Sequence, residues 1–120
     1  MREYRLVNGL FSPVSSVSQS PTTYLAGATP VISAAGTKNG IMWTIERPAL
    51  LWTEEATNNA VLHAYSATNL HNEIYNSNMN SSRDLAGPAV KYQPPMVING
   101  KVYVGTQTEL DVYGLCPCPQ

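Results

Sequence analysis

The chain repeats a short pattern of apolar segments and turns. Three segments recur in the same order: PVIS, GIMW and VLHAY at residues 30–33, 40–43 and 61–65, then PMVI, GKVY and ELDVY at residues 95–98, 100–103 and 109–113. Residues 3–6 are a weaker copy of the third segment, so Tyr4, Tyr65 and Tyr113 are predicted to be equivalent. Such repeats are typical of radial or solenoid β architectures, in which each unit buries its faces against the next.

The composition disfavours two classes of partner. Only 12% of the residues are charged and the formal net charge is -1, whereas an ordinary soluble domain is about 25% charged. A charge this small provides no electrostatic basis for binding nucleic acid or an acidic membrane surface. No apolar run is long enough to span a bilayer, and the first four residues lead into no apolar segment of a secretory signal, so no export signal is predicted.

Most of the chain is predicted to be β-strand, because β-branched and aromatic residues alternate with polar ones between turn residues. The predicted strands cover residues 4–7, 10–12, 29–34, 41–46, 60–66, 73–76, 95–98, 101–105 and 110–114. The pairs Asn8-Gly9 and Asn99-Gly100 suit tight hairpin turns. Polar loops are expected at 15–23 and 77–87, and the insertion 47–59 is expected to form a short helix or an ordered loop.

The predicted strands group into units of a single partial domain that spans residues 1–120. Residues 29–77 supply four strands, which is the usual content of one propeller blade. Residues 94–115 form an incomplete last unit without a fourth strand, and residues 1–12 are predicted to close a preceding blade. The tail, 116–120, carries Cys116 and Cys118, which form no disulfide framework and leave the redox compartment undecided.

At residues 30–32, 40–43, 62–70, 73–75 and 97–106 the chain resembles the pyrroloquinoline-quinone-like, or quinoprotein-type, β-propeller repeat proteins. The resemblance extends from residue 29 to residue 115. It implies an all-β fold, a partial β-propeller of antiparallel four-stranded blades, at the C-terminal end of a larger bacterial protein in the periplasm or outside the cell. It also implies missing blades or another protein as partners at exposed sheet edges, with self-association as an alternative, because an open array leaves edges unpaired.

The family name suggests a quinone cofactor, which would need a specific set of residues to hold it. In quinoprotein alcohol dehydrogenases the cofactor lies between a tryptophan and a disulfide of adjacent cysteines, beside a calcium ion. Cys116 and Cys118 are separated by Pro117 and do not match that pair. Trp43 alternates with Ile41 and Ile45 on one strand face, which favours packing between blades. No cofactor and no cofactor-binding residue is therefore predicted.

Four polar side chains have the spacing of a calcium loop: Asn76, Asn78, Asn80 and Asp84. The pattern fails at two required positions, because Ser81 replaces the sharp-turn glycine and Gly87 stands where a bidentate glutamate is needed. A solvated loop with Asx turns is the better interpretation. Residues 36–40 resemble a phosphate loop only loosely, because Walker spacing needs a Lys-Ser or Lys-Thr pair after the second glycine and Ile41 follows Gly40 instead. A long hairpin turn is predicted there.

The remaining candidates for chemistry are two histidines and an acidic group. His63 and His71 have only the two tail cysteines as soft companions, whereas zinc needs three or four ligands held together. His63 takes the place that Asp111 has in the last unit, which indicates a polar face of a sheet. Adjacent Glu54 and Glu55, with Glu46, are the densest acidic group, but neighbouring loop residues point apart, and a solvated charge pair is favoured. No nucleophile motif is present, and no metal site is predicted.

The sequence favours a non-catalytic β-propeller segment that acts as a structural scaffold or protein-interaction module of a bacterial cell-envelope or secreted protein. The alternative is the C-terminal part of a quinone-dependent oxidoreductase whose cofactor residues lie outside this chain. A third possibility is a small protein that oligomerises to complete a ring.

Overall fold

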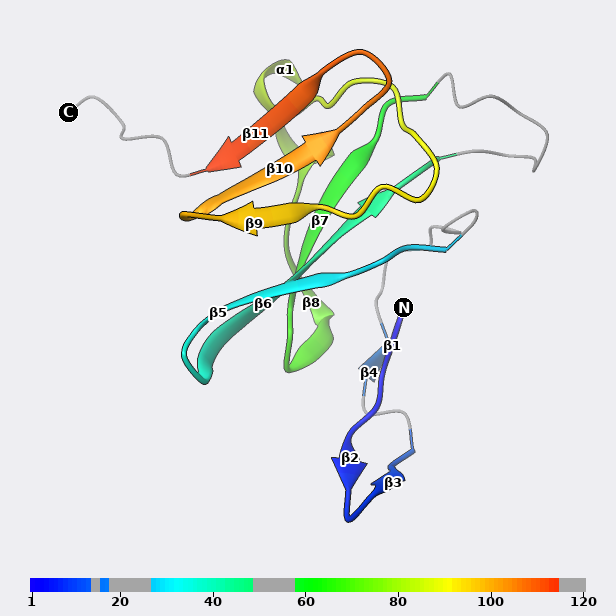
Figure 1. The fold of residues 1–120 in the computed structure, drawn as a ribbon, viewed down its shortest axis with the longest axis vertical. Coiled ribbons are helices and arrows are strands. Elements are labelled where there is room, and N and C mark those ends of the chain that lie inside the picture. Colours follow the sequence, from blue (N-terminus) through cyan, green and yellow to red (C-terminus); the bar gives the residue numbers. More distant parts are fainter. Residues whose placement is uncertain (14–15, 18–26, 49–57, 115–120) are drawn as a thin grey trace.

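The fold consists mainly of antiparallel β-sheets, as the computed structural model of residues 1–13, 16–17, 27–48 and 58–114 shows (Figure 1). Eleven strands and two helical turns make up the regular structure of these residues. The prediction of an all-β chain is confirmed. Most of residues 47–59, and with them Glu54 and Glu55, lie outside the described residues, as do Cys116 and Cys118.

The first large sheet has four strands in the order β5-β6-β7-β8: β5 Val31–Ala35, β6 Lys38–Glu46, β7 Val61–Ser66 and β8 Asn69–Asn76. Each strand pairs antiparallel with the next one along the chain. A hairpin joins β5 to β6 as predicted, but its turn is only residues 36 and 37, and β6 begins at Lys38, three residues before the predicted strand, so the long turn predicted at 36–40 is wrong. β8 begins four residues before the predicted strand at Glu73, because pairing with β7 continues up to the turn at 67–68.

The second sheet has three strands in the order β11-β10-β9: β9 Met96–Ile98, β10 Lys101–Gly105 and β11 Leu110–Gly114. The bounds of β10 and β11 agree with the prediction. Asn99 and Gly100 have φ values of 51° and 71°, the left-handed backbone that a two-residue hairpin turn requires. Within the described part of the chain, no fourth strand joins this sheet.

The strands of the two sheets are paired in the same register. Three cross-strand pairs of the first sheet each have a counterpart in the second: Met42↔Tyr65 corresponds to Val102↔Tyr113, Thr44↔His63 to Val104↔Asp111, and Val31↔Trp43 to Met96↔Tyr103. The repeat in the sequence is therefore a repeat in strand pairing. Tyr65 and Tyr113 occupy equivalent places as predicted. Tyr4 does not, because it lies in irregular chain between two short strands.

The main hydrophobic core lies between the two sheets, which stack on one another (Figure 1). Because alternate residues of a strand point to opposite faces, one face of β6 and β7 carries Ile45 and Leu62 into this core. The facing side of β10 contributes Val102 and Val104. Trp43 is half-buried against the same core, and its Nε1 donates a hydrogen bond to Ser33 Oγ at 2.8 Å. The prediction that Trp43 packs between sheets is confirmed.

A helical turn joins the two sheets at one end. The 3-10 helix η1 Ser77–Asn80 and the short helix α1 Ser81–Asp84 lie where a polar loop was predicted. The Asn76 side chain starts this turn by accepting a hydrogen bond from the backbone N of Asn78 at 3.1 Å, as an Asx turn does. Tyr75 donates its hydroxyl to Asp84 Oδ2 at 2.9 Å, and Tyr113 donates to the Asp84 carbonyl at 3.0 Å. One residue of α1 thus binds a strand of each sheet.

The segment that leads from the helical turn to the second sheet passes close to both sheets. Its Gly87 carbonyl accepts from the backbone N of Ala60 at 2.9 Å, and its Gly87 N–H donates to Asp111 Oδ2 at 3.1 Å. A Cβ at this glycine would lie 2.5 Å from Thr106 Oγ1 and 2.7 Å from Glu109 Oε1. A side chain at this position would therefore have to displace the side chains of Thr106 and Glu109.

The N-terminal residues form two small pairs of strands, β1 Arg2–Glu3 with β4 Ser16–Val17 and β2 Leu6–Val7 with β3 Leu10–Phe11. The β2–β3 hairpin turns at Asn8-Gly9, as predicted, and extends away from the two large sheets (Figure 1). The β1–β4 pair was not predicted. Met1 packs on the second hydrophobic cluster, formed by Met42, Tyr65 and Leu70.

Candidate functional site

A group of polar side chains lies buried on the face of the four-stranded sheet that points away from the second sheet. The alternation that sends Ile45 and Leu62 into the main core sends Thr44, Glu46 and His63 to this opposite face. Register places Thr44 directly across from His63. All three are almost fully buried, and the exposed fraction of His63 is 5%.

His63 is held between two carboxylates. Its Nε2 lies 2.7 Å from Glu46 Oε2, and its Nδ1 lies 2.5 Å from Glu73 Oε1. Glu46 comes from β6, His63 from β7 and Glu73 from β8, so three neighbouring strands contribute one residue each. Glu73 reaches Nδ1 through a stretch of β8 in which the register with β7 shifts. A protonated imidazole has two N–H donors, and it satisfies both carboxylates at once.

The surroundings of His63 favour its charged form. Burial lowers the pKa of His63, but the hydrogen bonds and the charges of Glu46 and Glu73 together outweigh burial and raise the pKa above its usual value of 6.5. Tyr65 stacks on the imidazole with its ring centroid 5.9 Å away. The cluster is thus a buried cation between two anions, which is costly to break once formed because a buried charge would lose its partner.

This arrangement is suited to holding strands together and poorly suited to catalysis. Both imidazole nitrogens are engaged by carboxylates, and the ring is covered. A general acid or base must come within hydrogen-bond reach of a substrate. The side chain of Glu73, 25% exposed, is the member of the group that solvent reaches most readily. We therefore assign the group a structural role.

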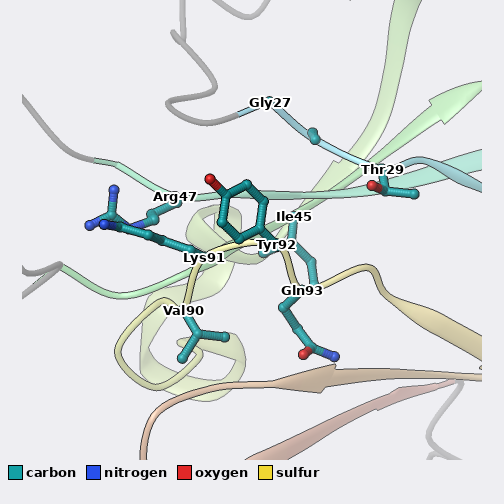
Figure 2. A pocket seen from close by; sticks show the side chains of 9 residues that line it. Gly27, Thr29, Ile45, Arg47, Val90, Lys91, Tyr92 and Gln93 are labelled. Carbon is teal, nitrogen blue, oxygen red and sulfur yellow. The ribbon is translucent and has the colours of Figure 1, made fainter. Parts of the chain in front are cut away.

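A small pocket opens near the end of β6, on the side of the strand opposite to Glu46. It has a volume of about 180 Å³ and is lined by Gly27, Ala28, Thr29, Ile45, Arg47, Val90, Lys91, Tyr92 and Gln93. Figure 2 shows Arg47 and Lys91 extending toward the same side of it, with the Tyr92 ring beside them. Sites for drug-sized ligands occupy about 300–1,000 Å³. This pocket is too small for such a molecule.

The other polar residues singled out in the sequence have local roles. His71 is exposed on β8, where its backbone N donates to Asn69 Oδ1 at 3.1 Å, and His63 does not share a site with it. Asn80 Oδ1 accepts a hydrogen bond from Ser82 Oγ at 2.8 Å. Arg83 lowers the pKa of Asp84 by hydrogen bonding to its carboxylate. The Asx turn at Asn76 agrees with the prediction, whereas residues 77–84 are helical and not the predicted loop.

Sequence reasoning missed the acidic partners of His63. It placed Glu46 with Glu54 and Glu55, and it did not single out Glu73 at all. The prediction of a polar sheet face at His63 agrees with the structure. The sequence did contain a signal for the pairing of Glu46 with His63. Side chains alternate between the two faces of a strand, and this alternation places Glu46 and His63 on the same face once β6 and β7 pair.

Among the described residues, no group of three or more histidine, cysteine, aspartate or glutamate side chains is arranged to hold a metal ion. The helical segments found there are four residues each, so none of them could cross a membrane.

Comparisons with protein-family models, with curated proteins and with solved structures found no match. The resemblance of residues 29–115 to propeller repeats therefore stays a prediction.

Proposed function

We propose that this chain is a segment of a stacked β-sheet array of the partial β-propeller kind, and that it acts as a non-catalytic scaffold or protein-interaction module of a bacterial cell-envelope or secreted protein. The observation that carries the proposal is the shared register of the two large sheets. Sheets that are paired alike and packed face to face are the units from which such arrays are built.

The direction of stacking supports an array that continues from unit to unit. In the first sheet, the face with Ile45 and Leu62 is covered by the second sheet. The second sheet meets it with Val102 and Val104, which are equivalent to Met42 and Thr44 on the opposite face of the first sheet. The two sheets thus contact each other through unlike faces. Contacts of this kind can be repeated by every further unit.

The buried polar group supports the non-catalytic role. His63 and Glu46 are enclosed, and their hydrogen bonds tie β6 to β7, while Glu73 adds β8. Asp111, which is equivalent to His63, also makes a structural contact, because it accepts the backbone N–H of Gly87. Equivalent polar positions in the two units thus both hold the fold together.

A double-mutant cycle across the sheets tests the stacked arrangement. Tyr75 of β8 and Tyr113 of β11 meet edge to face, with ring centroids 6.5 Å apart. We expect Tyr75→Leu and Tyr113→Leu to be coupled by about 0.5–1.5 kcal/mol in the free energy of unfolding, as aromatic pairs are. Their coupling would be measured by urea denaturation in dilute protein. Additive effects would show that the two sheets do not stack in solution.

A cofactor titration tests the alternative that the chain belongs to an oxidoreductase. Pyrroloquinoline quinone with calcium would be added up to high micromolar concentration, and the absorption spectrum of the quinone would be followed. We expect no change. A saturable spectral shift would contradict the non-catalytic role and would favour the oxidoreductase.

A further inference from the structure

Asparagine is followed by glycine at three places in the chain, 8–9, 39–40 and 99–100. The asparagines Asn8, Asn39 and Asn99 all have left-handed backbone, with φ values of 49°, 55° and 51°. Glycine has no side chain to shield its backbone nitrogen from the asparagine side chain before it. Because the following residue is the same at all three sites, a large difference in their reactivity would come from the fold.

The reaction open to such a pair is the loss of ammonia from the asparagine side chain. The backbone nitrogen of the glycine attacks the side-chain carboxamide carbon, a new C–N bond closes a five-membered succinimide ring, and the bond to the side-chain nitrogen breaks. That nitrogen leaves as ammonia and carries away the proton of the glycine amide. Water then opens the ring to aspartate, or to isoaspartate, in which the backbone runs through the former side chain. The ring holds the ψ angle of the asparagine far from its left-handed value, so the turn has to open before the ring can close.

The turn at Asn8 belongs to the hairpin that has the least to hold it closed. Its strands β2 and β3 are two residues long each, and all four of their side chains are 56–77% exposed. Two hydrogen bonds between Arg5 and Ser12, of 2.8 and 3.1 Å, and the edge-to-face contact of the Tyr4 and Phe11 rings close its base. The hairpin extends away from the two large sheets (Figure 1). An isolated two-stranded hairpin is at best marginally stable in water.

The other two asparagines are tied to the two large sheets. Asn99 joins β9 to β10, and β10 also pairs with β11 and carries Val102, which is 4% exposed, into the main core. Asn39 lies in β6, the nine-residue strand between β5 and β7. The carbonyl of the next residue, Gly40, accepts a hydrogen bond from the backbone N of Ala67 at 2.9 Å. Opening either site disturbs a large sheet, which costs more free energy than opening the β2–β3 hairpin.

We propose that Asn8 is a site of spontaneous deamidation and isoaspartate formation, and that the fold protects Asn39 and Asn99. Because the reaction is slow compared with the opening and closing of a turn, its rate follows the fraction of time that the turn is open. The product carries one more negative charge, which takes the formal net charge from -1 to -2. Isoaspartate also adds a carbon to the backbone of a turn that two residues close, so the β2–β3 hairpin does not regain its native pairing. The proposal does not depend on the stacking of the two large sheets.

Peptide mapping by mass spectrometry compares the three sites in one chain kept in mildly alkaline buffer. We expect Asn8 to deamidate about tenfold faster than Asn39 and Asn99, or more, and a tenfold ratio corresponds to about 1.4 kcal/mol in the free energy of opening. In guanidinium chloride all three turns are open, and the three rates should become similar. An Asn8 that reacts no faster than Asn99 in the folded chain would overturn the proposal. So would an excess at Asn8 that persists undiminished in the denaturant.

A disulfide across the hairpin tests whether opening limits the reaction. Leu6 and Phe11 face each other, so the double variant Leu6→Cys with Phe11→Cys has a separation that a disulfide can bridge. The two tail cysteines are replaced by serine in this variant. The oxidised form is expected to deamidate at Asn8 roughly tenfold more slowly than the reduced form, because its turn stays closed. Asn99, whose rate should not change, is the internal control, and equal rates at Asn8 in both forms would contradict the proposal.

Discussion

At the scale of single residues, the position of His63 has a measurable consequence for stability. Its pKa is raised in the folded chain, so the folded state binds the proton more tightly than the unfolded state. The stabilisation is complete below the unfolded pKa, near 6.5, and is lost as the pH rises through the higher folded pKa. We expect the free energy of unfolding to fall over that range, as measured by urea denaturation at a series of pH values.

The control for this prediction is His63→Gln, which has no titrating ring. Its stability should be lower than that of the wild type at pH 6, and it should lack the decline above pH 6.5. A wild-type curve that stays flat from pH 6 to the pH of alkaline unfolding would show that His63 is not protonated between its carboxylates.

Thr44 offers a second test at the same scale. Its side chain is fully buried, and within the described residues its Oγ1 has no hydrogen-bond partner. The equivalent residue in the second sheet is Val104, also fully buried. We expect Thr44→Val to stabilise the fold by about 1 kcal/mol, because an unsatisfied buried hydroxyl costs about 1–3 kcal/mol. Thermal unfolding measures the change, and a loss of stability would indicate that the hydroxyl has a partner.

The histidine group could be predicted only in part. The period-two pattern of residues 61–66 identifies a strand, and the equivalence with Asp111 identifies a polar face. Glu73 lies ten residues from His63 and reaches it only because β8 shifts its register against β7. Such a shift leaves no mark in composition or spacing. The buried state of the face also depends on N-terminal residues such as Met1, which a strand pattern does not place.

At the scale of elements, the segment around Gly87 decides how closely the sheets approach. A methyl group there would collide with Thr106 and Glu109. We expect Gly87→Ala to destabilise the fold by about 1–3 kcal/mol, the usual cost of overpacking. Adding Glu109→Ala should recover part of the loss, because one of the two colliding side chains is then shortened. An alanine variant as stable as the wild type would show that the segment is not tightly packed.

The strands were predictable wherever turns bounded an alternating pattern. Asn99-Gly100 and the alternation of residues 101–105 predict β10 with its observed bounds. The two-residue strands β1 and β4 were not predicted, because so short a pairing shows no period. The helical turn at 77–84 was also missed. Asparagine and serine favour loops and helix starts alike, and the hydrogen bonds from Tyr75 and Tyr113 to Asp84 that hold this turn come from distant strands.

At the scale of the whole molecule, Leu62 and Leu110 test which faces of the two sheets are covered. They occupy equivalent places in the first and the second sheet. Leu62→Ala removes a fully buried side chain from the core between the sheets. We expect it to cost about 2–5 kcal/mol, the usual range for buried leucine. Leu110→Ala should cost less than about 0.5 kcal/mol in dilute protein, as surface substitutions do. Chemical denaturation of both variants measures the difference, and equal costs would show that the face of the second sheet that points away from the first sheet is covered within one chain.

The shared register of the two sheets also bears on how such a chain changes over generations. Tandem duplication of the DNA that encodes one sheet would add a unit whose strands pair as their parents do. The new unit would inherit one face that fits its predecessor and another that fits its successor. Lengthening would therefore require no newly evolved kind of contact between sheets.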